Sequence, residues 1–166
     1  MVEHSDAAFN LVRRDRIALP TPWIIRLMAF FEIFGSNNKG YASPWLQLTV
    51  VCAIAQDGME PEHAFALRGK VIAAAPIEFE FKDSAAFIVF FPGSAEGLQS
   101  ATNLAESLRQ CAREKSLSAF GAAVQQGECL AQMRSSGRFV AKPAGPLIAQ
   151  AMRLATEEAE VKVGKA

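Results

Sequence analysis

The sequence predicts an α+β domain in which helices cover one face of a mainly antiparallel sheet. Short apolar runs rich in β-branched and aromatic residues alternate with segments of helical periodicity, and two of these runs follow each other closely. The chain has 166 residues, 51% of them hydrophobic. That is enough for one well-buried core and short for two.

The first strand and the helix after it are predicted between residues 45 and 75. WLQLTVVCAIA, residues 45–55, is a short apolar run bounded by turn formers, which is typical of a strand buried on both faces. EPEHAFALRGKVIAAA, residues 60–75, begins with a proline near its start, and its periodicity predicts a helix. Four of its residues recur at helical spacing: Phe65, Arg68, Ile72 and Ala75.

A hairpin and a long helix are predicted next. Residues 77–82 alternate between apolar and charged side chains, and AAFIVFF, residues 85–91, reads as a second buried strand. Lys82, Asp83 and Ser84 form the natural turn between the two strands. Residues 94–115 repeat leucine and alanine at i, i+3, i+4 spacing, which predicts an amphipathic helix with Ser94 as its N-cap.

The C-terminal part is predicted to contain a second hairpin over residues 120–142, which turns at Ser135, Ser136 and Gly137, and a closing helix over residues 145–160. The run TEEAEVKVGK is predicted to be solvated, and VKVGKA to form a last short strand. The order of elements is a βαββαβ core of the ferredoxin-like kind. Many unrelated functions use this arrangement, so only particular residues can narrow the function.

An N-terminal extension, residues 1–45, is predicted to precede the domain at 46–166. TPWIIRLMAFFEIF, residues 21–34, reads as an apolar helix, and turn formers between it and the domain predict a linker. The helix is far shorter than the roughly 20 residues needed to cross a bilayer, so we expect no membrane span. Two interpretations stay open: a helix packed on the domain or in a dimer, and an interfacial membrane or partner helix.

Composition favours neither nucleic acid nor anionic lipid as a partner. Lys+Arg and Asp+Glu number 17 each and the pI is about 6.7, so no basic field favours nucleic acid or anionic lipid. The three cysteines are widely separated among apolar residues, as expected for reduced thiols, and the first twenty residues do not form a secretory signal. We therefore expect a cytoplasmic protein with no metal site and no cofactor.

Four stretches, in order over residues 46–157, carry a family resemblance: LTVVCAIA, FKDSAAFIVFF, FGAAVQQGECL and GPLIAQAMRL. They resemble the patterns V-x-V-x-F-A-D-I, G-D-x-x-x-A-x-F, R-I-G-I-H-x-G-E and G-D-x-V-N-x-A-A-R-L of the class III adenylate and guanylate cyclase catalytic domains. The resemblance implies the ferredoxin-like fold of that family and a site that normally lies at a dimer interface.

The resemblance also implies roles for individual residues. Asp83 matches the second of two metal-binding aspartates, although Lys82 replaces the glycine before it, and Arg153 matches the arginine that stabilises phosphate charge in the transition state. The remaining positions lack the family's side chain: Ala53 for the first metal aspartate, Ala149 for the ribose-orienting asparagine, and Pro146 and Phe79 for the residues that read the purine.

Because groups that act as a unit fail together, cyclase activity is not expected. The sequence predicts a truncated, catalytically inactive cyclase-like domain, a homodimer that acts in regulation or as a scaffold with a protein partner. Asp83 can equally be an ordinary turn residue, and Arg153 can equally pair with Glu157 one turn later.

Three alternatives stay open. The domain could be a small-molecule or nucleotide sensor, with Lys82, Lys142, Arg138 and Arg153 as anion contacts and Phe79 and Ala53 lining the cleft. It could be a non-catalytic half of a heterodimeric cyclase, or an unrelated ferredoxin-like binding module.

Overall fold

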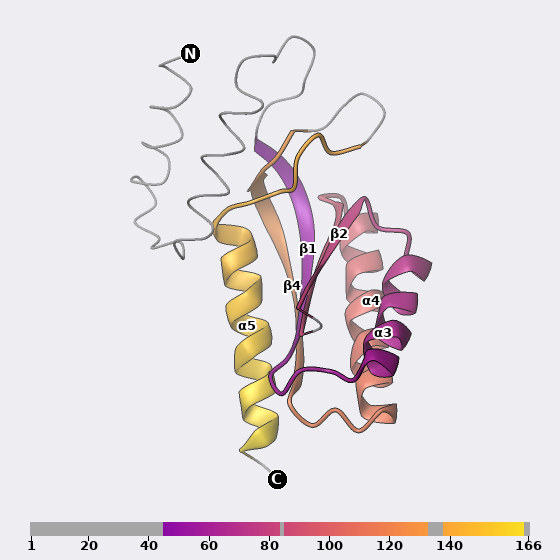
Figure 1. The fold of residues 1–166 in the computed structure, drawn as a ribbon. Helices are drawn as coiled ribbons and strands as arrows, with labels where there is room; N and C mark the ends of the chain where they lie inside the picture. Colours follow the sequence, from indigo (N-terminus) through magenta and orange to yellow (C-terminus); the bar gives the residue numbers. More distant parts are fainter. Residues whose placement is uncertain (1–44, 84, 133–137, 165–166) are drawn as a thin grey trace.

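The computed structural model contains a four-stranded antiparallel sheet with helices on both of its faces (Figure 1). It describes residues 45–83, 85–132 and 138–164, and the predicted N-terminal helix and linker lie outside these ranges. The elements in chain order are β1 (Trp45–Ala55), α3 (Pro61–Ala73), β2 (Glu78–Lys82), β3 (Ala86–Pro92), α4 (Ala95–Glu114), β4 (Phe120–Leu130) and α5 (Pro146–Val163). The predicted α+β class and ferredoxin-like core are confirmed. Within the described ranges, no helix is both long and apolar enough to cross a membrane.

The strand order is β2-β3-β1-β4, with every neighbouring pair antiparallel, so β1 lies inside the sheet and β2 and β4 form its edges. Val50 and Cys52 of β1 face α5, whereas Val51 and Ala53 face α3 and α4. All four side chains are fully buried. This two-sided burial explains why the sequence of β1 is almost continuously apolar.

The predicted hairpin at residues 77–91 is present as β2 and β3. Phe79 and Phe81 of β2 point toward α3 and α4, with their ring centroids 5.1 Å apart. On the opposite side of β2, Glu80 forms an ion pair with Lys142 at 3.3 Å. The alternation in the sequence therefore corresponds to an apolar and a charged side of this edge strand.

The prediction that helices cover only one face of the sheet is wrong. α3 and α4 cover one face, and α5 covers the other (Figure 1). Ile88 and Phe90 of β3 point toward α5 and are buried beside Val50. Because these side chains would otherwise be exposed to water, the second face also needs a helix.

Two predictions about the C-terminal part are also wrong. The return arm of the second hairpin is not a strand: Leu130 and Ala144 form an isolated bridge, and Phe139 packs on Phe90 with ring centroids 6.3 Å apart. The chain therefore crosses the face of the sheet instead of extending it. The tail does not form a strand either, because α5 continues to Val163. The predicted turn at 135–137 lies outside the described residues.

The spacing that predicted α3 identified the wrong face of that helix. Phe65 and Ile72 are 78% and 54% exposed, and the buried residues are Leu67 and Val71. The predicted stripe also contains Arg68, which lies over the ring of Phe81 at 5.1 Å and keeps its guanidinium at the surface. The helix is therefore rotated so that the stripe next to the predicted one faces the core.

The contact between α5 and β4 predicts a strong effect of one methyl group. A Cβ atom at Gly121 would lie 2.0 Å from the carbonyl oxygen of Ala155 and 2.7 Å from the backbone nitrogen of Ala159. Both atoms belong to the α5 backbone, so α5 would have to move. We expect Gly121→Ala to lower the free energy of unfolding in urea by about 1–3 kcal/mol.

The matched control is Gly69→Ala in α3, where an added Cβ would meet nothing within 4 Å. Alanine is the better helix former, so this change is expected to raise the free energy of unfolding by about 0.5–1 kcal/mol. Equal effects of the two substitutions would contradict the close contact between α5 and β4.

Candidate functional site

Asp83 lies in the tight turn between β2 and β3. Its φ of +47° is in the left-handed region, which aspartate tolerates better than most residues, and its side chain is exposed. Lys82, just before it, ends β2. Across the part of the chain that the structure describes, no three His, Cys, Asp or Glu side chains gather as they would around a metal. Asp83 thus has a local role in the turn, whether or not it binds anything.

Arg153 lies on the outer side of α5. Ala151 and Ala155 of the same helix are fully buried against the sheet, and helical geometry places Arg153 on the opposite side. Its side chain is 60% exposed and forms an ion pair with Glu157, one turn later. α5 packs on β4 and β1, whereas Asp83 follows β2 at the other edge of the sheet. The structure therefore does not bring Arg153 and Asp83 together within one chain.

The remaining positions assigned by the resemblance are apolar in the structure as well. Ala53 is fully buried under α3 and α4, where Phe79 packs against the same cluster. Aligned letter by letter with LTVVCAIA, residues 48–55, the pattern V-x-V-x-F-A-D-I places its aspartate on Ile54 and not on Ala53. This corrects the assignment made from the sequence. Ile54 packs against the opposite cluster, below α5. Neither position offers a metal ligand. Pro146 and Ala149 lie in the first turn of α5.

The sensor alternative invoked two further cations, Lys142 and Arg138. Lys142 pairs with Glu80, which offsets its charge, and Arg138 is exposed. Lys142 belongs to the segment that crosses the α5 face, whereas Phe79 and Ala53 face α3 and α4. The structure does not gather the proposed anion contacts and the proposed lining residues around one cleft.

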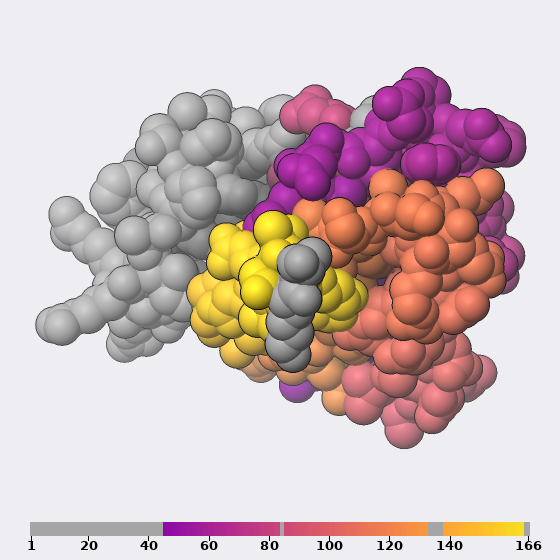
Figure 2. Space-filling view, turned by 90° about the horizontal axis from the view of Figure 1, so that it is seen from below, coloured from indigo at the N-terminus to yellow at the C-terminus, as the bar shows by residue number. Residues whose placement is uncertain are grey.

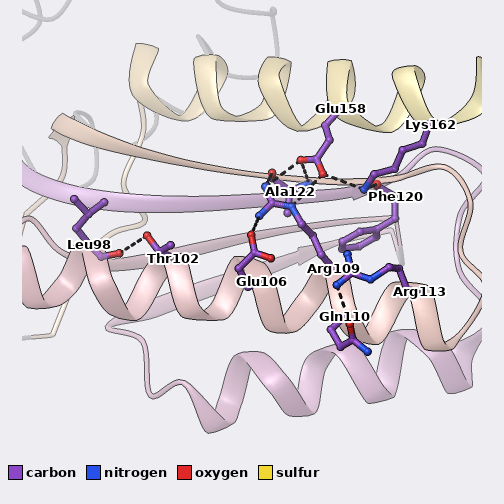
Figure 3. Close-up of polar contacts among 10 residues, drawn as sticks. All are labelled: Leu98, Thr102, Glu106, Arg109, Gln110, Arg113, Phe120, Ala122, Glu158 and Lys162. Carbon is purple, nitrogen blue, oxygen red and sulfur yellow. Dashed lines mark hydrogen bonds and ion pairs between the residues drawn. The ribbon is translucent and has the colours of Figure 1, made fainter. Parts of the chain in front are cut away.

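The largest polar network among the described residues lies elsewhere, at the outer edge of β4 (Figure 3). We call Arg109, Glu158 and Lys162 the edge clamp. Arg109 of α4 donates through Nη2 to the carbonyl of Ala122 at 2.6 Å and through Nε to Glu158 of α5 at 3.0 Å. The N–H of Ala122 donates to Glu158 at 3.1 Å. Lys162 donates to the carbonyl of Phe120 at 2.8 Å and to Glu158 at 3.0 Å.

The edge clamp joins helices from opposite faces of the sheet around its edge. Seen from below, the C-terminal end of α5 lies beside the residues that lead from α4 into β4 (Figure 2). Sequence analysis missed this network and wrongly placed Glu158 in a solvated run. The only local signal was the i, i+4 spacing of Glu158 and Lys162.

Hydrogen bonds and opposite charges within the edge clamp shift the pKa values of Glu158 and Arg109. Burial opposes ionisation of Glu158, but hydrogen bonds from Arg109, Lys162 and the N–H of Ala122 outweigh it and hold the pKa of Glu158 below its ordinary value. Burial likewise opposes the charge on Arg109, and Glu158 together with Glu106 raises the pKa of Arg109 above its ordinary value. Both groups are charged at neutral pH, so the edge clamp is an ion-pair network.

Cysteine chemistry finds no support in the described residues. Cys52, Cys111 and Cys129 are all free and buried. Burial raises the pKa of Cys129 to about 12, and burial also raises the pKa of Cys52 above its ordinary value. A nucleophilic or metal-binding thiol needs thiolate character, which these two sites suppress.

The fold is similar to that of nucleotidyl cyclases of known structure. The crystal structure of the guanylyl cyclase Cya2 matches with a TM-score of 0.51 and 11% sequence identity, covering 68% of this chain and 71% of that one. The adenylyl cyclase CyaB from P. aeruginosa matches with a TM-score of 0.45 and 12% identity, over 76% of this chain and 83% of that one. A bacterial light-regulated adenylyl cyclase matches with a TM-score of 0.44 and 13% identity, over 70% and 41%.

No family model and no curated protein matches the sequence. The similarity therefore lies in the fold, which is that of the class III nucleotidyl cyclase domains. The resemblance inferred from four short stretches is confirmed at this level. A shared fold leaves the chemistry of the site open.

The edge clamp predicts a pH-dependent contribution to stability. A carboxylate whose folded pKa is lowered stabilises the fold above its unfolded pKa, and this contribution is lost as the pH falls through the folded pKa. We expect Glu158→Gln to lower the free energy of unfolding by on the order of 1–2 kcal/mol at neutral pH. The difference from the wild type should shrink as the pH falls below the ordinary carboxyl range.

Glu157→Gln is the matched control, since it removes the same charge from the next residue of α5. Glu157 is half exposed and pairs with the exposed Arg153, so its loss should cost about 0.5 kcal/mol or less. Chemical denaturation of the three proteins at several pH values makes the comparison. A penalty for Glu158→Gln that stays constant down to pH ~3 would rule out the ionised clamp.

Proposed function

We propose that this chain is a catalytically inactive domain of the nucleotidyl cyclase fold that works in the cytoplasm by binding, as a regulatory or assembly module in signalling. The observation that carries the proposal is the state of Arg153. It points away from the sheet, and Glu157 neutralises it. A cation that stabilises a phosphoryl transition state must be directed at the place where negative charge develops.

The first strand gives independent support. Cyclase chemistry as implied by the family resemblance uses two carboxylates that hold divalent metals, because those ions prefer hard oxygen ligands. Ala53 and Ile54 at the end of β1 offer none, and both side chains pack against apolar clusters. Asp83 alone, next to the cation Lys82, would be a weak ligand set.

The same proposal includes a homodimer. α3 leaves Phe65 and Ile72 exposed on one side of the helix, and large apolar residues at a surface favour contact with another chain. Light scattering of the wild type and of Phe65→Glu tests this part, and a wild-type monomer would remove the dimer from the proposal.

The main test is a direct assay for cyclic nucleotide formation from ATP and from GTP, each with Mg²⁺ and with Mn²⁺. We expect no product above the protein-free background. Arg153→Ala should leave that result unchanged and shift the free energy of unfolding by about 0.5 kcal/mol or less, because its ion pair is exposed. Turnover by the wild type that Asp83→Asn abolishes would contradict the proposal.

Calorimetric titration with the same nucleotides separates the binding alternatives. Nucleotide binding that disappears in Arg153→Ala would favour the sensor. Product formed only after a complete cyclase is added would favour the heterodimeric half.

A further inference from the structure

The outer side of β4 is blocked at both of its ends and open in the middle. β4 pairs with β1 in an unbroken antiparallel register along its whole length. In such a pair, residues alternate between those that bond to the partner strand and those whose N–H and C=O point outward. Ala122 and Leu130 both bond outward, one to the edge clamp and the other to Ala144. The residues of the same parity between them are Val124, Gln126 and Glu128.

The backbone groups of these three residues have no partner among the residues that the structure describes, whereas their neighbours along the edge do. At one end the edge clamp occupies Phe120 and Ala122. At the other end, Leu130 and Ala144 exchange two hydrogen bonds of 2.9 and 2.8 Å. Exposed edges are commonly protected by lysine, proline or a bulge, and the stretch VQQGE, residues 124–128, contains none of these.

Apolar side chains flank this open stretch on both faces of the sheet. On the α4 side, Leu98 is 38% exposed and lies on the same flank of the helix as the clamp arginine, three turns away (Figure 3). Gln126 reaches the carbonyl of Ser94, one turn before Leu98, at 3.3 Å. On the α5 side, Leu154 lies one turn before the clamp glutamate and is partly buried.

A second copy of β4 does not fit this stretch. Antiparallel pairing about a two-fold axis at Gln126 would place Ala122 of one chain opposite Leu130 of the other. The space beside Ala122 holds the edge clamp, and the space beside Leu130 holds Ala144, so two copies would collide at both ends. A separate extended segment of about five residues avoids both obstacles, because it leaves the edge at each end.

We propose that residues 124–128 of β4 bind an extended peptide segment of a partner protein as an additional strand. Alternate side chains of the segment lie on the two faces of the sheet, so apolar residues of the segment contact Leu98 on one face and Leu154 on the other. Glu128 within the stretch and Glu106 beside the clamp are exposed, so an uncharged or basic segment fits better than an acidic one. The site rests on the proposed function and identifies where the domain binds.

The test uses the full chain and a displayed library of random nine-residue peptides. Selected peptides are measured by fluorescence polarisation against the wild type, Glu128→Pro and Glu128→Ala. Proline removes the outward N–H of residue 128 and leaves the β1 ladder untouched, whereas alanine keeps that N–H. We expect affinity to fall about tenfold or more for Glu128→Pro and to stay within about threefold for Glu128→Ala.

Amide hydrogen exchange supplies a readout that is specific for strand addition. In the free protein, the amides of Gln126 and Glu128 should exchange faster than those of Gln125 and Gly127, which bond to β1. Bound peptide should slow the first pair. Leu98→Asp is the second variant, which weakens binding without changing the backbone and serves if Glu128→Pro does not fold.

Three results would overturn the proposal: no peptide selected, equal affinity for the wild type and both Glu128→Pro and Leu98→Asp, or binding that leaves the amides of residues 126 and 128 unprotected. A wild-type dimer that Glu128→Pro converts to a monomer would assign the edge to a second copy instead. Cyclic nucleotide formation would overturn the proposed function and leave the peptide result standing, so the two failures are distinguishable.

Discussion

The burial of β1 on both faces is the constraint on which the rest of the structure depends. Val50 and Val51 are neighbours that point in opposite directions, and neither is exposed. A strand of this kind is stable only if both faces of its sheet are covered, because leaving either side in water would forfeit its hydrophobic contribution. α3 and α4 cover one face, so α5 has to cover the other. This requirement also fixes which side of α5 faces the solvent, and Arg153 lies on that side.

The two faces are linked around the edge of β4. Helices that cover the two faces of a sheet do not supply hydrogen-bond partners for the backbone groups at its edges, and these groups need partners of their own. The edge clamp provides them at Ala122 and Phe120, and because Arg109 comes from α4 and Glu158 from α5, it also ties the helices to one another. Arginine suits this task, since its planar fork contacts a carboxylate and a carbonyl at once.

The sequence correctly predicted the secondary-structure elements that local patterns determine. The central strand, the first hairpin and α4 all follow from periodicity and turn chemistry, and Ser94 accepts the N-cap hydrogen bond from Gly97 at 3.1 Å as expected. The position of α5 and the edge clamp could not be predicted in this way, because they depend on contacts between residues far apart in the chain. Glu157 and Glu158 illustrate the difference. They are identical neighbours in a run predicted to be solvated, yet a rotation of about 100° along the helix exposes one and places the other against β4.

The same distinction bears on the family resemblance. The stretches that resemble cyclases agree best where their patterns describe packing: apolar positions in β1 and small residues in α5, such as Ala151 and Ala155, that lie against the sheet. They disagree where the patterns describe chemistry. The likeness to the guanylyl cyclase Cya2, at 11% identity, is a likeness of fold, and a shared fold does not determine the chemistry of a site. The two polar residues that match the patterns each have a local role, Asp83 in a left-handed turn and Arg153 in a pair with Glu157. Those local roles are sufficient to account for both residues.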